Sequence, residues 1–160
     1  MAGAAGEAAS RGYRVVQLEE PVVGEARIAG PAHLRRAVAM LGGVQRPACV
    51  ISTGETTVRV TGHGKGGRNQ EFALAAAVPL AAVDGAMLAS VGTDGVDGPT
   101  DAAGAFAHTD TLSLARARGL RPETFLDDNN AYAFFDAIGH LIHTGPTGTN
   151  VGDLQLILLA

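Results

Sequence analysis

The stretch Gly62-His63-Gly64-Lys65-Gly66-Gly67-Arg68-Asn69-Gln70-Glu71 holds four glycines within its first six residues. It follows an alternating run at 57–60 and leads into an alanine-rich run at 72–78. Glycine permits positive φ and close approach of a ligand, and the first N–H groups of a helix attract anions. Lys65 and Arg68 add two cations. The stretch therefore predicts a strand, an anion-binding loop and a helix; the alternative is a tight turn with solvated charges.

Apolar periodicity and turn residues predict that helices and strands alternate along the chain. This alternation predicts a layered α/β/α domain with a mixed β-sheet. Pro31 predicts a kink or a restart in its helix, and residues 52–55 are expected to connect two strands. We expect helices at 2–11, 25–41, 111–118, 122–127, 131–138 and from the glycine-rich stretch to Pro79, and strands at 13–18, 48–51, 56–60, 86–91, 140–143 and 154–159.

Composition limits the kind of protein this is. The chain has 160 residues, of which 46% are hydrophobic and 18% charged, which is typical of one globular domain. A net charge of −4 without a basic run gives no indication of a nucleic-acid partner. Cys49 is the single cysteine, which suits a reducing compartment. No apolar run reaches the length of about 20 residues that a membrane span needs, so we expect a cytoplasmic protein.

Two further loops carry polar groups after predicted strands, where open α/β sheets bind ligands. The loop at 92–101 supplies Asp94, Asp97 and Asp101. Carboxylates of this kind suit Mg²⁺ or accept a proton from a substrate hydroxyl. Asp-Gly pairs are also ordinary turn formers, so a simple turn is the alternative. The loop at 144–150 offers hydroxyl and backbone donors for phosphate or sugar oxygens. The alternative is that its own side chains cap the loop.

Two nucleotide motifs are excluded by their context. Gly62-x-Gly64-x-x-Gly67 matches the dinucleotide fingerprint, with Asp84 at about the expected distance of 20 residues. However, the preceding strand alternates where a buried parallel strand should be apolar throughout, and Asp84 falls in a turn. No phosphate-binding loop of the Gly-Lys-Ser/Thr type is present, and no Gly-x-Ser-x-Gly elbow indicates a hydrolase nucleophile.

From Val50 to the C-terminus the chain resembles the MOFRL domain, the C-terminal domain of glycerate 2-kinases, some of which carry an older hydroxypyruvate reductase name. Residues 1–45 resemble the segment that joins this domain to the first domain of the full enzyme. We expect residues 1–45 to form a helix–strand–helix segment of the same domain, and residues 46–160 to form the MOFRL core. One departure is Thr53, where the family usually has glycine. The resemblance rests on Gly54 to Val58, Gly64 to Leu74, Gly92 to Gly95 with Asp97 to Thr100, Asp128 to Asn130 with Tyr132, Phe134 and Phe135, and Thr144 to Val151 with Asp153 and Leu154.

The resemblance implies transfer of the γ-phosphoryl group of ATP to the 2-hydroxyl of glycerate, with Mg²⁺, in a cleft between two domains. The first, Rossmann-like domain with its catalytic lysine is not part of this chain, so it is the expected partner, in cis or in trans, and the chain alone should be inactive. The implied catalytic residues are Arg68 and Asp94, and the implied metal ligands are Asp94 and Asp97. Phosphate or substrate is expected to be bound by Glu55, Thr56, Lys65, Gly66, Gly67, Asn69, Thr93, Thr147, Gly148, Thr149 and Asn150.

Other functions stay open at this point. A module that binds phosphate or carboxylate ligands without catalysis is one alternative, and a hydroxypyruvate reductase is a weaker one. A homodimer is compatible with the sequence. Because Arg68 is a charged residue on a predicted loop, we expect that its replacement removes activity without affecting folding.

Overall fold

The computed structural model describes residues 1–160. Its centre is a seven-stranded mixed sheet with the order β1-β3-β7-β4-β5-β6, in which β2 also pairs with β3. The strands are β1 (Arg14–Gln17), β2 (Val22–Glu25), β3 (Ala48–Thr57), β4 (Ala86–Gly92), β5 (Gly104–His108), β6 (Leu141–Ile142) and β7 (Asp153–Leu159). The helices are α1 (Ala2–Ser10), α2 (Ala26–Leu41), α3 (Arg68–Leu80), α4 (Thr111–Ala117), α5 (Pro122–Asp127) and α6 (Ala131–Ile138).

The C-terminal strand decides how the sheet is assembled. β7 lies between β3 and β4 and runs antiparallel to both. β1 and β2 pair with successive halves of β3 in parallel, whereas β5 and β6 continue the sheet in antiparallel fashion. The predicted mixed sheet is therefore confirmed. Its antiparallel pairs come from β7, β5 and β6, and not from a separate strand at 56–60.

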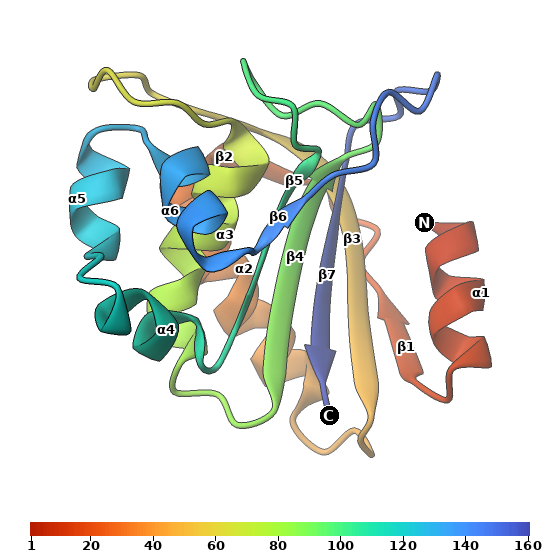
Figure 1. The fold of residues 1–160 in the computed structure, drawn as a ribbon. Coiled ribbons are helices and arrows are strands. Elements are labelled where there is room, and N and C mark those ends of the chain that lie inside the picture. Colours follow the sequence, from red (N-terminus) through yellow and green to blue (C-terminus); the bar gives the residue numbers. More distant parts are fainter.

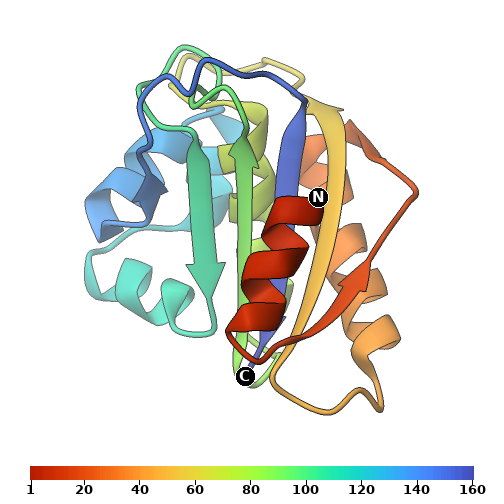
Figure 2. The same ribbon diagram turned by 90° about the vertical axis from the view of Figure 1, so that its right-hand side faces the viewer.

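The layered α/β/α arrangement is confirmed, with very unequal helical layers. Figure 1 shows α2 to α6 on one face of the sheet, and α1 alone on the other face. Figure 2 shows α1 lying across the front of the strands. None of α1's residues is buried, so the core lies almost entirely on the side of α2 and α3. No helix combines the length and the apolar character needed to cross a bilayer.

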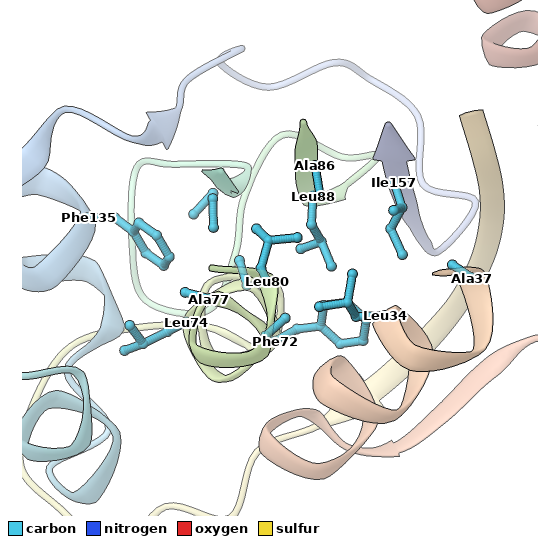
Figure 3. Packing of buried hydrophobic residues seen from close by; sticks show 14 of the residues in the cluster. Leu34, Ala37, Phe72, Leu74, Ala77, Leu80, Ala86, Leu88, Phe135 and Ile157 are labelled. Carbon is cyan, nitrogen blue, oxygen red and sulfur yellow. The ribbon is translucent and has the colours of Figure 1, made fainter. Parts of the chain in front are cut away.

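α3 is the central element of the core. Most of its residues are buried all round the helix, as expected for a helix surrounded by other elements. Figure 3 shows Leu80 facing Leu88 of β4 and Ile157 of β7, with Leu34 of α2 on one side and Phe135 of α6 on the other. The rigid packing of α3 fixes the position of its first residue, Arg68, at the upper end of the sheet.

Two details of the predicted strands are wrong. Residues 52–55 are not a connection, because β3 is one continuous strand of ten residues. Gly54 pairs with Val22 on one side and with Asp153 on the other, so hydrogen bonds from both neighbours extend the strand. β2 and β5 were not predicted at all. The helix α2 runs through Pro31 without restarting.

We predict that Gly54→Ala destabilises the fold. A methyl group at this position would collide with the backbone of Val22 in β2, and overpacking of this kind costs about 1–3 kcal/mol. The matched control is Gly6→Ala in α1, where nothing lies within 4 Å of the added carbon and helix propensity favours alanine. Urea unfolding measures both variants. Equal midpoints for Gly54→Ala and the wild-type chain would show that β2 is not pressed against Gly54.

Candidate functional site

Three loops meet at one end of the sheet, as the upper part of Figure 1 shows. They are the glycine-rich loop 58–67 after β3, the loop 93–103 after β4 and the loop 143–152 before β7. Because β7 is antiparallel to β3 and β4, its first residue lies beside the last residues of those strands. The second and third of these loops are joined by hydrogen bonds, such as Thr93 N–H to the Gly152 carbonyl at 3.1 Å and Thr147 N–H to the Asp94 carbonyl at 3.1 Å.

Arg68 makes a two-pronged ion pair with Asp153. Its Nε donates to Asp153 Oδ2 at 2.7 Å and its Nη2 to Oδ1 at 2.9 Å. The Asp153 side chain is completely buried, while 31% of the Arg68 side chain is exposed. This side-on geometry uses Nε and one N–H of Nη2. Nη1 makes no hydrogen bond within the chain, and Glu55 Oε1 lies 3.8 Å from Nη2.

The exposed edge of Arg68 faces an open groove. The groove has a volume of about 630 Å³ and lies between the end of β3, the start of α3 and the loop after β4. It therefore brings the predicted residues Glu55, Thr56 and Arg68 together. Its lining consists of Glu55, Thr56, Thr57, Val58, Val60, Gly66, Gly67, Arg68, Gly98 and Pro99.

The N-terminus of α3 is already occupied by a carboxylate of the chain itself. Asp97 accepts the N–H of Asn69 at 3.0 Å and the N–H of Gln70 at 2.8 Å, and the Asn69 side-chain amide at 3.2 Å. Asp97 is 1% exposed. The prediction that the first N–H groups of α3 are free for a ligand anion is therefore wrong for Asn69 and Gln70, while the N–H of Arg68 has no partner in the chain. The metal role of Asp97 stays a prediction, and both of its oxygens are engaged in this cap.

The turn 128–130 accepts hydrogen bonds from the backbone N–H groups of the glycine-rich loop. The N–H groups of Thr61 and Gly62 donate to Asn129 Oδ1 at 2.7 and 2.9 Å. Those of His63, Gly64 and Lys65 donate to Asp128 Oδ1, the Asp128 carbonyl and Asn130 Oδ1. Every N–H from Thr61 to Lys65 is thus paired inside the chain.

The loop glycines are required by close packing and not by positive φ. None of the glycines from Gly62 to Gly67 has a positive φ. A side chain on Gly62 or Gly64 would collide with Asp128 or Asn130. The expectation that these glycines free the backbone for a ligand is therefore wrong for Gly62 and Gly64. Gly66 and Gly67 line the groove beside Arg68.

Asn129 anchors the loop to the core. It is 7% exposed and has a φ of 52°, the one non-glycine residue with positive φ. Its Nδ2 donates to the Arg59 carbonyl at 3.1 Å and to Glu71 Oε2 at 3.0 Å. Glu71 is also buried and pairs with Arg27 of α2 at 3.0 Å. With its Oδ1 occupied as well, Asn129 uses its full hydrogen-bonding capacity.

The predicted residues of the two other loops mostly bind one another. Asp94 Oδ1 accepts the Val96 N–H at 3.1 Å, and its Oδ2 accepts the Asn150 amide at 3.4 Å. Thr93 Oγ1 donates to the Gly152 carbonyl at 2.7 Å, and Thr147 Oγ1 donates to the Thr93 carbonyl. Gly148 and Thr149 lie on the exposed tip of the loop. Lys65 is directed over the ring of Tyr132, 4.6 Å from its centroid.

Sequence reasoning missed Asp153, Asn129 and Glu71 as parts of the site. Asp153 was quoted only as part of a family segment, although an acid at the start of an otherwise apolar strand was a usable signal. Asn129 was likewise named within a family segment, and Glu71 in the glycine-rich stretch at the start of a predicted helix. Neither placement could indicate the partner, because Asn129 and Glu71 are 58 positions apart.

We predict that Asp97 titrates near neutral pH. Burial raises its pKa from the ordinary 3.8 to about 6, although the N–H groups of Asn69 and Gln70 lower it. The folded state then binds a proton before the unfolded state does as the pH falls. Its contribution to stability is therefore complete below pH 3.8 and is lost as the pH rises through about 6.

Urea unfolding at pH 7, 6, 5 and 4 tests this titration, with Asp97→Asn as the control that cannot titrate. The stability of the wild-type chain relative to Asp97→Asn should rise by up to about 3 kcal/mol as the pH falls. The ¹³C shift of the Asp97 carboxyl should move with a midpoint near pH 6. A constant difference between the two chains would contradict the raised pKa.

We predict that Arg68→Ala costs stability. The substitution leaves the Asp153 carboxylate buried without its cation, which should cost about 2–3 kcal/mol when the partial exposure of Arg68 is allowed for. This replaces the expectation from sequence that folding is unaffected. In a double-mutant cycle, Arg68→Ala with Asp153→Asn should lose less than the sum of the single losses, by at least about 1 kcal/mol. Additive losses would show that the pair is not coupled.

The sequence of this chain is similar to those of known proteins. Residues 48–153 match the MOFRL family model. The D-glycerate 2-kinase of Thermotoga maritima is 48% identical over 72% of this chain, which covers 28% of that enzyme. A protein of Agrobacterium vitis, provisionally named hydroxypyruvate reductase, is 40% identical over 98% of this chain and 42% of its own length.

The structural comparison gives the same relationship. The crystal structure of a glycerate kinase from Thermotoga maritima superimposes with a TM-score of 0.90 at 41% identity, over 98% of this chain and 39% of that one. The chain spans less than half the length of each of these proteins. It belongs to the MOFRL family and is homologous to the C-terminal region of glycerate kinases.

Proposed function

We propose that this chain supplies the C-terminal part of an ATP-dependent glycerate 2-kinase. In this enzyme the γ-phosphoryl group of ATP passes to the 2-hydroxyl of glycerate, in a site completed by a first, Rossmann-like domain. The homologues named as glycerate kinases support the reaction class. Because the chain spans only part of their length, we expect no useful turnover from it alone, since positioning of both reactants supplies much of the rate.

One observation carries the proposal: an oriented guanidinium at the edge of an open groove. Asp153 binds Nε and Nη2 of Arg68, whose partly exposed side chain lines the groove, and Nη1 makes no hydrogen bond within the chain. Such preorganised cations stabilise developing negative charge without reorganisation at the moment of reaction. Phosphoryl transfer depends on positioned cations more than on covalent chemistry. This arrangement supports Arg68 as the residue that contacts the anionic reactants.

The residues fit a partial Mg²⁺ site. No three His, Cys, Asp or Glu side chains are grouped to hold a metal ion, but Mg²⁺ is usually bound by one or two carboxylates with waters and substrate phosphates. Asp94 fits such a role because its Oδ2 has only one long contact, with Asn150 at 3.4 Å. Asp97 does not fit, since the α3 cap uses both of its oxygens. A bound Mg²⁺ would neutralise phosphate charge there.

The alternatives receive less support. A nicotinamide-dependent reductase would need the amides of the Gly62-x-Gly64-x-x-Gly67 fingerprint for a pyrophosphate. The N–H groups of Gly62 and Gly64 are instead paired with the turn 128–130. A binding module without catalysis has the same groove and Arg68, and only turnover separates it from a kinase domain.

A domain exchange tests the proposal. The matching segment of the Thermotoga maritima D-glycerate 2-kinase is replaced by this chain, and ADP formation is followed with and without glycerate. We expect glycerate-dependent turnover, with 2-phosphoglycerate identified by ³¹P NMR. Arg68→Lys keeps the charge and loses the planar fork, and should lower kcat/KM at least about 100-fold, as for loss of one oriented donor.

The matched control is Arg59→Lys. Arg59 is exposed and its side chain makes no hydrogen bond or ion pair in the chain, so the same loss of the planar fork should leave turnover unchanged. A folded exchange protein without glycerate-dependent ADP formation would favour the binding module. Oxidation of NADH by hydroxypyruvate would instead favour the reductase.

A further inference from the structure

Many backbone donors of the loops around the groove are already used within the chain. The N–H groups from Thr61 to Lys65 bind the turn 128–130, and those of Asn69 and Gln70 bind Asp97. The N–H groups of Gly66, Gly67 and Arg68, which line the groove, have no partner in the chain. These adjacent donors beside one guanidinium suit a single anionic group, whereas a triphosphate needs donors for several groups at once.

The charge around Arg68 also disfavours a polyanion. Asp153, Glu55 and Asp97 are the carboxylates whose charges act on Arg68. One guanidinium is therefore surrounded by negative groups, and the other cation of the loop, Lys65, lies over Tyr132. A small monoanion meets less repulsion here than a triphosphate does.

The free edge of Arg68 has the shape that a carboxylate needs. Nε and one N–H of Nη2 are used by Asp153, so Nη1 and the second N–H of Nη2 remain as parallel donors. Arginine and carboxylate groups form two parallel hydrogen bonds in this geometry. The volume of about 630 Å³ leaves ample room for a three-carbon acid.

Glu55 lies where the neighbouring hydroxyl of such an acid would be. Its Oε1 is 3.8 Å from Arg68 Nη2, and its side chain is 71% exposed and unpaired apart from this contact. In a 2-hydroxy acid the hydroxyl is on the carbon next to the carboxylate. An acid held by the Arg68 fork therefore presents its 2-hydroxyl within reach of the Glu55 carboxylate.

We propose that this chain holds the organic acid and not the nucleotide, with Arg68 binding its carboxylate and Glu55 accepting its 2-hydroxyl proton. The inference rests on the proposed kinase function. In the transfer, the 2-hydroxyl oxygen forms a bond to the γ-phosphorus of ATP while the bond from that phosphorus to the β,γ-bridging oxygen breaks. ADP leaves with that electron pair, and the hydroxyl proton passes to Glu55 as general base.

NMR titration of the 160-residue chain tests the binding step. The ligands are glycerate, 3-hydroxypropionate, which lacks only the 2-hydroxyl, and Mg·ATP. Glycerate should shift the Nε–H signal of Arg68 and the amides of Gly66 and Gly67 with saturation in the millimolar range. 3-Hydroxypropionate should bind about fivefold more weakly, as for loss of one hydrogen bond. Mg·ATP should leave these signals unchanged.

Two variants with matched controls separate the roles. Arg68→Lys, which keeps a cation beside Asp153, should weaken both acids at least tenfold. Glu55→Ala should abolish the difference in affinity between glycerate and 3-hydroxypropionate without weakening the binding of 3-hydroxypropionate. The controls Arg59→Lys and Glu19→Ala make the same changes in exposed side chains outside the groove and should change the affinity for neither acid.

The outcomes are distinct. Saturable shifts from Mg·ATP that disappear in Arg68→Lys would overturn the inference and leave the kinase proposal standing. Absence of saturable binding by glycerate would also overturn it. An equal loss for both acids in Glu55→Ala would exclude Glu55 as the hydroxyl partner. Failure of the domain exchange to give glycerate-dependent ADP formation, with glycerate still bound here, would instead remove the kinase function.

The proton-accepting role has its own readout in the domain-exchange enzyme. Glu55→Gln keeps a hydrogen-bond acceptor for the hydroxyl and removes the base. We expect kcat to fall about 100-fold, the lower end for loss of a general base, with KM for glycerate changed less than twofold. Glu55→Asp should recover part of kcat. An unchanged kcat in Glu55→Gln would overturn Glu55 as the base.

Discussion

The buried carboxylate of Asp153 is the group on which the upper end of the molecule depends. It begins β7, in register between Gly54 of β3 and Gly92 of β4. A buried charge is costly unless it is paired and hydrogen-bonded. Arg68 and Asn69, the first two residues of α3, supply this pairing and bring the helix N-terminus onto the sheet.

The polar groups near this pair are joined in one network. The Asn69 side-chain Nδ2 donates to both Asp153 and Asp97. Its Oδ1 accepts a hydrogen bond from Ser90 Oγ at 2.6 Å. Since buried hydrogen-bond networks hold their members rigidly, Asn69, Asp97 and Asp153 form a scaffold beneath the loops. What the scaffold leaves open is the outer edge of Arg68, the neighbouring Glu55 and the groove between them. Catalysis by proximity and orientation requires a few free side chains that are held rigidly in place.

Much of the secondary structure was predictable because its causes are local. The helices α4, α5 and α6 and the strands β4 and β7 lie close to their predicted bounds, since their apolar periods and turn residues are read within a few positions. The missed strands have non-local causes. β2 is a short strand that exists because it pairs with the second half of β3, and β5 continues the sheet beside β4. Neither partner can be identified from a short window of sequence.

The sequence by itself determined the layered α/β class, the family resemblance and the stretch in which Arg68 lies. Only the tertiary structure decided what the polar residues do. The glycines at 62 and 64 were expected to serve a ligand and instead admit the turn 128–130. Asp97 was expected to bind a metal ion, and in the fold it caps α3. The physical reason is that a hydrogen bond needs its partner within about 3 Å, and these partners lie tens of residues away in the chain.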